Sequence, residues 1–215
     1  MCIRDRFHDP RVAAVTGRLV RLSSLNGNPH ALPDEGRERV IFGGPERLTF
    51  ERSTTDWFER ANFGGIGQGA NLAIRRSLFA FWPGFDERRG GGTRLLGAEE
   101  HHALFRFIDR GHQVVYTPAA AVYHPYPAAD TELRKLRLRE IQSASAHLAL
   151  LLTEETGYRR RAAKYGLQAV ARRPRPWRMV PYAPPLGYWD TARASVIGLA
   201  RYLRTQLPSA PQNDR

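Results

Sequence analysis

The first part of the chain alternates short apolar runs with polar, turn-forming stretches. An apolar run over residues 7–22 has the turn pair Asp9-Pro10 near its start, and a second run covers residues 40–42. Residues 23–39, between them, are polar and rich in Gly and Pro. Apolar runs bounded by such residues are typical of buried strands joined by surface connections. The pattern predicts a strand over residues 7–22, a surface loop over 23–39 and a short strand at 40–42.

The middle of the chain carries extended and helical patterns in turn. Between residues 98 and 110 the apolar positions Ala103, Leu104, Phe107 and Ile108 share one face of a helix, and Gly111 follows where a helix often ends. Shorter segments are predicted from caps, turn residues and local apolar runs. The expected elements are an extended segment at 70–75, a short helix capped by Ser77, a glycine loop at 89–93, a helix at 98–110, and two strands at 114–116 and 120–123 on either side of Pro118.

Beyond residue 130 the pattern is mostly helical. Ile141, Ala144, Leu148, Leu151 and Leu152 form an amphipathic stripe at helical spacing. The later segments are predicted as a basic helix at 158–172, a Pro-rich linker at 174–185, a last helix that Asp190 caps and that runs to Leu203, and a frayed tail from residue 208.

Composition places the chain among globular proteins. Of its 215 residues, 42% are hydrophobic and 25% are charged, which argues against a disordered or fibrous chain. No apolar run approaches the roughly 20 residues that a membrane-spanning helix needs. The single cysteine excludes an internal disulfide framework and fits a reducing compartment. With no secretory signal visible, these features predict a cytoplasmic protein.

Positive charge is concentrated toward the C-terminus. The net charge is +12, and residues 131–215 hold 16 Lys and Arg against 6 Asp and Glu. Such a block suits contact with an anionic lipid surface, and it is equally typical of a solubilising face on surface helices. Both interpretations stay open. Nucleic acid is not expected as a partner, because the segment contains no helix-turn-helix or RNA-binding pattern.

Polar residues able to carry chemistry gather between residues 69 and 124. The segments are Gly69-Ala70-Asn71, Gly84-Phe85-Asp86-Glu87, Gly97-Ala98-Glu99-Glu100, Tyr116-Thr117-Pro118 and Val122-Tyr123-His124. Two carboxylates in the first turn of a helix suit the helix dipole, which favours negative charge there. A carboxylate beside a pocket could equally accept a proton from a sugar hydroxyl while its neighbour orients a substrate. The residues alone leave both interpretations of the Glu99-Glu100 pair open.

Taken in order, these segments resemble the second half of the catalytic domain of bacterial family 2 glycosyltransferases. The matching series begins with Asp-Pro-x-Val-x-x-Val-x-Gly at residues 9–17, Gly-x-Asn followed by Arg75, and Gly-Phe-Asp-Glu at 84–87. It continues with the acidic pair and Arg106, then residues 111–118, and it closes with Val-x-His at 122–124. Each motif is weak alone, whereas six in this order over residues 7–124 are specific.

The resemblance implies an inverting transfer of a sugar from a nucleotide-sugar donor to a saccharide or lipid-linked acceptor, in cell-envelope or exopolysaccharide synthesis. Glu100 occupies the position of the general base on the acceptor hydroxyl, with Glu99 beside it. The resemblance further implies a divalent metal, Mg²⁺ or Mn²⁺, in the full-length enzyme. The remaining implied assignments are substrate contacts by Gly69, Asn71, Asp86 and Arg106, and a metal ligand at His124, for which a packing or hydrogen-bonding role is an open alternative.

Two departures from the family pattern bear on activity. Glu100 stands where the family usually has Asp, which moves the carboxylate by one methylene. The chain also has no Asp-x-Asp motif, through which family members hold the metal that neutralises the leaving diphosphate. We therefore expect a fragment of the enzyme that binds the donor poorly by itself.

The fold class implied by the resemblance is α/β: an incomplete GT-A (nucleotide-diphospho-sugar transferase) mixed sheet flanked by helices, with an α-helical C-terminal extension. The expected organisation is a non-native leader at residues 1–6, the C-terminal half of the GT-A domain at 7–128, a basic helical extension at 129–207 and a disordered tail at 208–215. The expected location is the cytoplasm, with peripheral contact to the inner face of the plasma membrane. The alternative function is a non-catalytic module that binds membrane or nucleic acid through the basic C-terminal helices.

Overall fold

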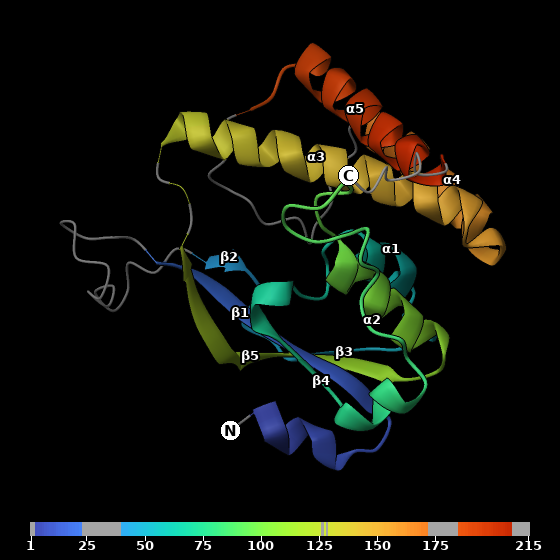
Figure 1. Cartoon of the computed structure of the whole chain (residues 1–215). Helices are drawn as coiled ribbons and strands as arrows, with labels where there is room; N and C mark the ends of the chain where they lie inside the picture. The colour runs from blue at the N-terminus through green and yellow to red at the C-terminus, as the bar shows by residue number, and fades with distance from the viewer. Residues whose placement is uncertain (1–2, 23–39, 126, 128, 172–184, 208–215) are drawn as a thin grey trace, which may run out of the picture. The chain divides into compact units, whose positions relative to one another are not determined.

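The computed structural model describes residues 3–22, 40–125, 127, 129–171 and 185–207 (Figure 1). By their contacts these residues form two compact units, which are described separately. We call the first, with residues 3–85 and 99–133, the sheet unit. The second, with residues 86–98, 134–171 and 185–207, is the helical unit. The glycine-rich segment at 86–98 thus groups with the C-terminal helices, although it lies between two parts of the sheet unit in the sequence.

The helices and strands follow one another in a mixed α/β order. The strands are β1 (Val12–Leu22), β2 (Val40–Phe42), β3 (Leu48–Phe50), β4 (Leu72–Ile74) and β5 (Gln113–Pro125). The α-helices are α1 (Trp57–Asn62), α2 (Glu99–Asp109), α3 (Asp130–Thr153), α4 (Arg159–Val170) and α5 (Tyr188–Gln206). Short 3-10 helices are η1 (Ile3–His8), η3 (Gly69–Asn71), η4 (Arg76–Ala80) and η5 (Thr156–Tyr158). None of the described helices is both long and apolar enough to cross a membrane.

The sheet unit is built around β1, the central strand of a five-stranded mixed sheet. One edge of β1 pairs in parallel with β5 along nearly its whole length. The other edge pairs antiparallel with β4 in its first half and with β2 near its end. On the far side of β5, β3 adds an antiparallel strand. The coarse prediction of a mixed sheet flanked by helices is therefore confirmed.

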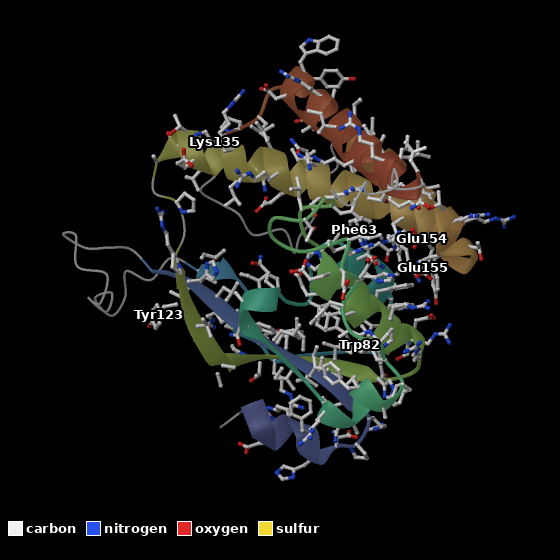
Figure 2. All side chains as sticks on the ribbon, viewed as in Figure 1. Phe63, Trp82, Tyr123, Lys135, Glu154 and Glu155 are labelled. Atoms are coloured by element: carbon white, nitrogen blue, oxygen red, sulfur yellow. The ribbon has the colours of Figure 1, made fainter. Side chains whose placement is uncertain are left out.

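Helices α1 and α2 lie together on one side of the sheet, and η1 lies on the other (Figure 1). Aromatic side chains join the two helices: the ring of Trp57 stacks on Phe105 with centroids 5.8 Å apart, and Phe58 meets the same ring edge-on. Trp82 packs edge-on against Phe107 at 4.9 Å (Figure 2). All five side chains are buried. Each such burial contributes about 1.5–3 kcal/mol, so these rings fix α2 against its neighbours.

The first half of β1 is held by η1 and by Arg75, which directly follows β4. Phe7 in η1 packs against buried Val12, Val15 and Val115. The Arg75 guanidinium donates hydrogen bonds to the carbonyl oxygens of Val12, Phe7 and Asp9, at 2.7, 2.9 and 2.6 Å. Charged hydrogen bonds are stronger than neutral ones, so Arg75 ties η1 to the start of β1.

The pairing of β1 with β5 shifts register twice, by one residue between Val12 and Ala14 and by more after Gly17. The register runs to Gly17 opposite Thr117 and resumes with Arg18 opposite Ala121, so β5 bulges by three residues. Pro118 lies in this bulge, where its missing N–H removes no ladder bond. Gly17 makes room for the bulge, because a Cβ built there would lie 2.1 Å from the carbonyl oxygen of Ala120.

In the helical unit, α5 packs closely on α3. A Cβ built on Gly198 would lie 2.2 Å from the carbonyl oxygen of Gln142, so only glycine permits this approach. A second contact is an apolar cluster formed by Leu95, Ala146, Ala149, Leu150 and Tyr202. Small residues at a helix contact let the two backbones approach, and this places the buried face of α5 directly on α3.

A charge cluster in the same unit connects the segment 86–98 to the end of α3. Arg88 donates two hydrogen bonds of 2.9 Å to Glu154, which directly follows α3 (Figure 2), and it also pairs with Asp86. Burial alone would raise the pKa of Glu154 and of Asp86, but hydrogen bonds from Arg88 outweigh it and lower both pKa values. Both carboxylates therefore stay charged in the folded protein at neutral pH.

Arg89 is the most deeply placed charge of this unit. It is only 4% exposed, and its Nη1 donates to the carbonyl oxygen of Ala98 and to Nδ1 of His147, at 2.9 and 2.8 Å. Since a guanidinium only donates, Nδ1 of His147 accepts and the ring carries its hydrogen on Nε2. The carboxylate of Asp86 lies 3.3 Å from Arg89 Nε and balances its charge.

The structure confirms several of the elements predicted from the sequence and differs from the prediction for others. The strand at 40–42, the helix near 98–110 with Gly111 at a positive φ of 87°, and the helix near 158–172 are present. The two strands around Pro118 are one strand, β5. The strand expected over residues 7–22 starts only at Val12, after η1 and a turn. Expectations for residues 23–39, 174–184 and 208–215 lie outside the described residues.

The predicted helix caps are wrong in two places. Ser77 lies inside η4, whose first flanking residue is Arg75. Asp190 lies inside α5, which begins after Gly187; its carboxylate instead pairs with Arg134 on α3. A polar residue that finds a partner on another element does not need the backbone of its own helix as a partner, and sequence reasoning cannot foresee this.

The close approach at Gly17 predicts a stability difference between two glycines. Gly17→Ala should lower the free energy of unfolding by about 1–3 kcal/mol, because the added methyl group meets backbone that cannot move aside cheaply. Gly44→Ala is the matched control, since a Cβ there meets nothing within 4 Å. Urea unfolding monitored by circular dichroism measures both. Equal stabilities would contradict the tight β1–β5 bulge.

The lowered pKa values of Asp86 and Glu154 predict a contribution to acid stability. Their ordinary values are 3.8 and 4.5. A carboxylate with a lowered folded-state pKa stabilises the protein above its ordinary pKa, and this stabilisation is lost as the pH falls through the lowered value. Glu154→Gln should therefore flatten the decline of Tm between about pH 5 and about pH 3. Glu46→Gln, at an exposed carboxylate, is the control, and parallel curves for all three proteins would contradict the cluster's role.

Candidate functional site

The candidate site lies in the sheet unit, at the N-terminus of α2. The backbone just before this helix is unusual: Leu96, Gly97 and Ala98 have φ values of 65°, 137° and 69°. Left-handed backbone at a residue other than glycine costs on the order of 1–2 kcal/mol. The chain thus enters α2 through a strained turn, whose residues 96–98 group with the helical unit.

Glu100 points from the first turn of α2 to the start of η3. Its Oε1 accepts a hydrogen bond from the backbone N–H of Gly69 at 3.3 Å. The side chain is 14% exposed, and Nε2 of His101 lies 3.7 Å from the same oxygen. The N-terminal turn of a helix favours negative charge, and the backbone N–H of Gly69 holds the carboxylate in place. Glu100 is therefore a fixed carboxylate with part of its surface open to solvent.

The two neighbours of Glu100 also bury polar atoms. Oε2 of Glu99 and Nε2 of His101 are both inaccessible to solvent, and no hydrogen-bond partner for either is found among the described residues. Leaving a buried polar atom unmatched costs about 1–3 kcal/mol, so such atoms call for a functional explanation. His101 was the residue that sequence reasoning missed here. The sequence contains no signal for its placement, because His101 and His102 fit no recognised ligand spacing.

Asn71 supports this site through the sheet. It is 5% exposed, and its Nδ2 donates to the carbonyl oxygens of Arg18 and Ala120 at 3.0 and 2.9 Å. These two carbonyls lie at the bulge between β1 and β5, where the regular β-ladder hydrogen bonds are interrupted. Asn71 therefore fills the break in the sheet and at the same time fixes η3, whose first residue contacts Glu100.

A second pair of contacts anchors the loop that leads into η3. Thr16 Oγ1 donates to the carbonyl oxygen of Ile66 at 2.6 Å, inside the sheet unit. A Cβ built on Gly67 would lie 2.3 Å from the Thr16 side chain, so the loop backbone rests directly on β1. By contrast, a Cβ on Gly69 would lie 3.8 Å or more from Glu100, which is ordinary contact. Gly69 thus contacts Glu100 through its backbone N–H, and this contact does not require a glycine at position 69.

The remaining residues expected at the site are placed elsewhere. Arg106 lies on α2 six residues after Glu100, about 240° around the helix, and its Nη1 is 3.9 Å from Asp109. Asp86 belongs to the helical unit, where it accepts hydrogen bonds from the backbone and guanidinium of Arg88. Substrate contacts by these two residues stay predictions.

His124 lies at the exposed end of β5. Its Nδ1 is 2.7 Å from the carbonyl oxygen of Pro125, which fixes the hydrogen on Nδ1 and leaves the lone pair on Nε2. This is the tautomer that metal-binding histidines adopt when their other nitrogen donates to a carbonyl. Among the described residues, however, no three His, Cys, Asp or Glu side chains gather in a way that could hold a metal ion. The described residues by themselves do not form a site for the expected Mg²⁺ or Mn²⁺.

Comparisons with protein-family models, with curated proteins and with solved structures found no match for this chain.

The two hydrogen bonds of Asn71 predict a structural role that can be separated from substrate binding. Asn71→Ala should lower the free energy of unfolding by about 2–3 kcal/mol, because two buried carbonyl oxygens lose their donors. Asn71→Asp should lower it further, since a carboxylate cannot donate to them. Gln68→Ala, a partly exposed neighbour, is the control. Chemical unfolding measures all four proteins, and an unchanged stability of Asn71→Ala would restrict Asn71 to a role in binding.

Proposed function

We propose that the sheet unit is the acceptor-side part of an inverting family 2 glycosyltransferase in which Glu100 is the general base. The observation that carries the proposal is the hydrogen bond from Gly69 N–H to Glu100 Oε1. It joins two of the motifs that resemble the family, although 31 residues separate them in the sequence. A chance resemblance would not be expected to bring the proposed base against the Gly-x-Asn segment.

The fold supports the proposal in a coarser way. Parallel β1 and β5, antiparallel neighbours and helices on the sheet are compatible with part of a GT-A domain. In open α/β sheets, ligands bind near the carboxyl ends of the parallel strands. Asn71 donates hydrogen bonds to β1 and β5 beyond Gly17, in the carboxyl-terminal halves of both strands. Because Asn71 and Gly69 are both in η3, Glu100 lies near the same ends of the strands.

In the proposed reaction Glu100 accepts the proton of an acceptor hydroxyl. The hydroxyl oxygen forms a bond to the anomeric carbon of the donor sugar, and the bond from that carbon to the nucleoside diphosphate breaks on the opposite face. The diphosphate leaves with the bonding electron pair, and the proton stays on Glu100. Gly69 N–H orients the carboxylate, and His101 lies beside it, with Nε2 3.7 Å from the same oxygen. The metal that the resemblance implies is assigned no step.

The longer side chain at position 100 has a structural consequence. Glu100 reaches the N–H of Gly69 at 3.3 Å, and the family's usual Asp would fall short by about one carbon–carbon bond. Glutamate is therefore suited to this particular arrangement of α2 and η3. We propose that it supports the base function here, on a saccharide or lipid-linked acceptor in the cytoplasm.

Substitutions at position 100 test the base. Glu100→Gln, which cannot take up the proton, should lower kcat by about 10²–10⁴-fold. Glu100→Asp should lower it by roughly 100-fold, because misplacement by about 1 Å is enough to do so. Transfer is measured with the protein expressed from its native gene, a panel of radiolabelled UDP- and GDP-sugars, and saccharide or lipid-extract acceptors.

Glu87→Gln is the matched control, because Glu87 is an exposed carboxylate in the helical unit. It should transfer at the wild-type rate. Retained transfer by Glu100→Gln would rule out Glu100 as the base while leaving the family assignment standing. Absence of transfer by the wild-type protein with every donor would count against the enzyme and favour a non-catalytic module.

A further inference from the structure

Helix α5 has one buried face and one face without a protein partner among the described residues. The buried face consists of Ala194, Gly198 and Tyr202, each four residues from the next, and it packs on α3. On the opposite side lie five large exposed apolar residues, which we call the outer stripe: Trp189, Val196, Leu199, Leu203 and Leu207.

The spacing of the outer stripe follows the helix. Val196, Leu199, Leu203 and Leu207 are three, four and four residues apart, and Trp189 lies two turns before Val196. At about 100° per residue these positions centre on the side opposite Ala194, Gly198 and Tyr202. A helix that rests on one partner needs apolar residues on one side only. The second apolar side of α5 therefore requires another explanation.

The exposure of the stripe is large. Trp189 is 81% exposed, and Val196, Leu203 and Leu207 are each exposed by more than 60%. Single exposed apolar residues are ordinary, but a row of them on one side of a helix marks a surface that meets a membrane, another protein or a ligand.

Charge around the stripe favours a negatively charged partner. Arg193 and Arg204 border it on one side, and both belong to a region in which residues 131–215 hold 16 basic and 6 acidic residues. The one acidic residue of α5, Asp190, is paired with Arg134. The outer surface of the helix therefore presents apolar and cationic groups with no carboxylate that is free of a partner.

The N-terminal end of α5 adds an aromatic pair. Tyr188 and Trp189 are exposed, and their rings lie edge-on at 5.3 Å. Amphipathic aromatic side chains are enriched where hydrocarbon meets lipid headgroups. A helix of α5's length, with apolar residues on one side and arginines at the border, suits a position in the plane of that interface.

We infer that α5 binds the surface of an anionic lipid bilayer, with the outer stripe in the acyl boundary and the bordering arginines on the headgroups. This inference does not rest on sugar transfer. Pairing of the same face between two copies would bring equivalent arginines together, which is unfavourable, and a nucleic-acid backbone offers no apolar surface for the stripe. The buried face stays on α3, so docking needs no unfolding of the helical unit.

Vesicle flotation of the whole chain tests the lipid partner. Phosphatidylcholine vesicles and vesicles in which about a third of the lipid is phosphatidylglycerol are compared at low and high salt. We expect binding to the anionic vesicles, weaker binding at high salt, and at least tenfold weaker partitioning of the Val196→Ser/Leu203→Ser double variant. Arg193→Gln/Arg204→Gln should remove the preference for anionic lipid.

The control is Leu167→Ser/Val170→Ser on α4, at residues that are 73% and 75% exposed but outside the outer stripe. It should bind vesicles like the wild type. All substitutions are at solvent-exposed sites, and an unchanged circular dichroism spectrum and Tm verify the fold. As a second measurement, the tryptophan emission of the wild type should shift to shorter wavelength on anionic vesicles, and Trp189→Phe should abolish most of that shift.

Four results would overturn the inference. They are absence of flotation with anionic vesicles, equal binding of the outer-stripe variant and the α4 variant, self-association in sedimentation that the outer-stripe variant abolishes, and a salt-dependent shift with DNA or RNA without vesicle binding. Loss of vesicle binding in the outer-stripe variant while sugar transfer to a water-soluble acceptor persists would support it, and it would separate this inference from the enzymatic proposal.

Discussion

The sheet unit depends on the parallel pairing of β1 with β5. The two strands are about 90 residues apart in the sequence, and every other strand of the sheet attaches to one of them. Parallel pairing over such a separation is entropically costly to form, so it needs strong local support. Buried valines supply that support in the first halves of the strands. At the break after Gly17, where ladder bonds are interrupted, the amide of Asn71 takes their place.

The geometry of the candidate site follows from the hydrogen bonds of Asn71 at the β1–β5 bulge. Asn71 must lie beneath the bulge to reach two carbonyl oxygens, and this fixes the short helix η3 that it ends. Gly69, at the other end of η3, then presents its N–H to α2, where Glu100 accepts it. The three residues of η3 thus link the break in the sheet to the position of Glu100. One short element, η3, therefore holds the amide of Asn71 under the sheet and the N–H of Gly69 against the Glu100 carboxylate.

Sequence reasoning predicted the elements whose signals are local and missed those that depend on distant partners. The end of α2 before Gly111 could be predicted because it depends only on the residues of that helix and the glycine after it. The run of apolar residues in β1 likewise indicates a buried strand without knowledge of its partners. The prediction that Pro118 separates two strands is wrong, because the bulge that accommodates it depends on Gly17 on another strand. The strand β3 and the helix α1 are too short to show periodicity. The first half of α3 is rich in charge, so its apolar stripe starts only near Ile141.

The same limit explains what could be predicted of the site and of α5. The acidic pair was evident from its motif, but the burial of His101 Nε2 without a hydrogen-bond partner among the described residues arises from the fold and has no signature in the sequence. For α5, an apolar residue every three or four positions indicates a helix without revealing which side is covered. Gly198 decides this, because only its face allows α3 to approach the backbone. Once that face is fixed, Trp189, Val196 and Leu203 must point away from α3. The choice of which side of α5 is exposed therefore depends on the packing of Gly198 on α3. Neither the charge nor the hydropathy of the helix reveals this choice.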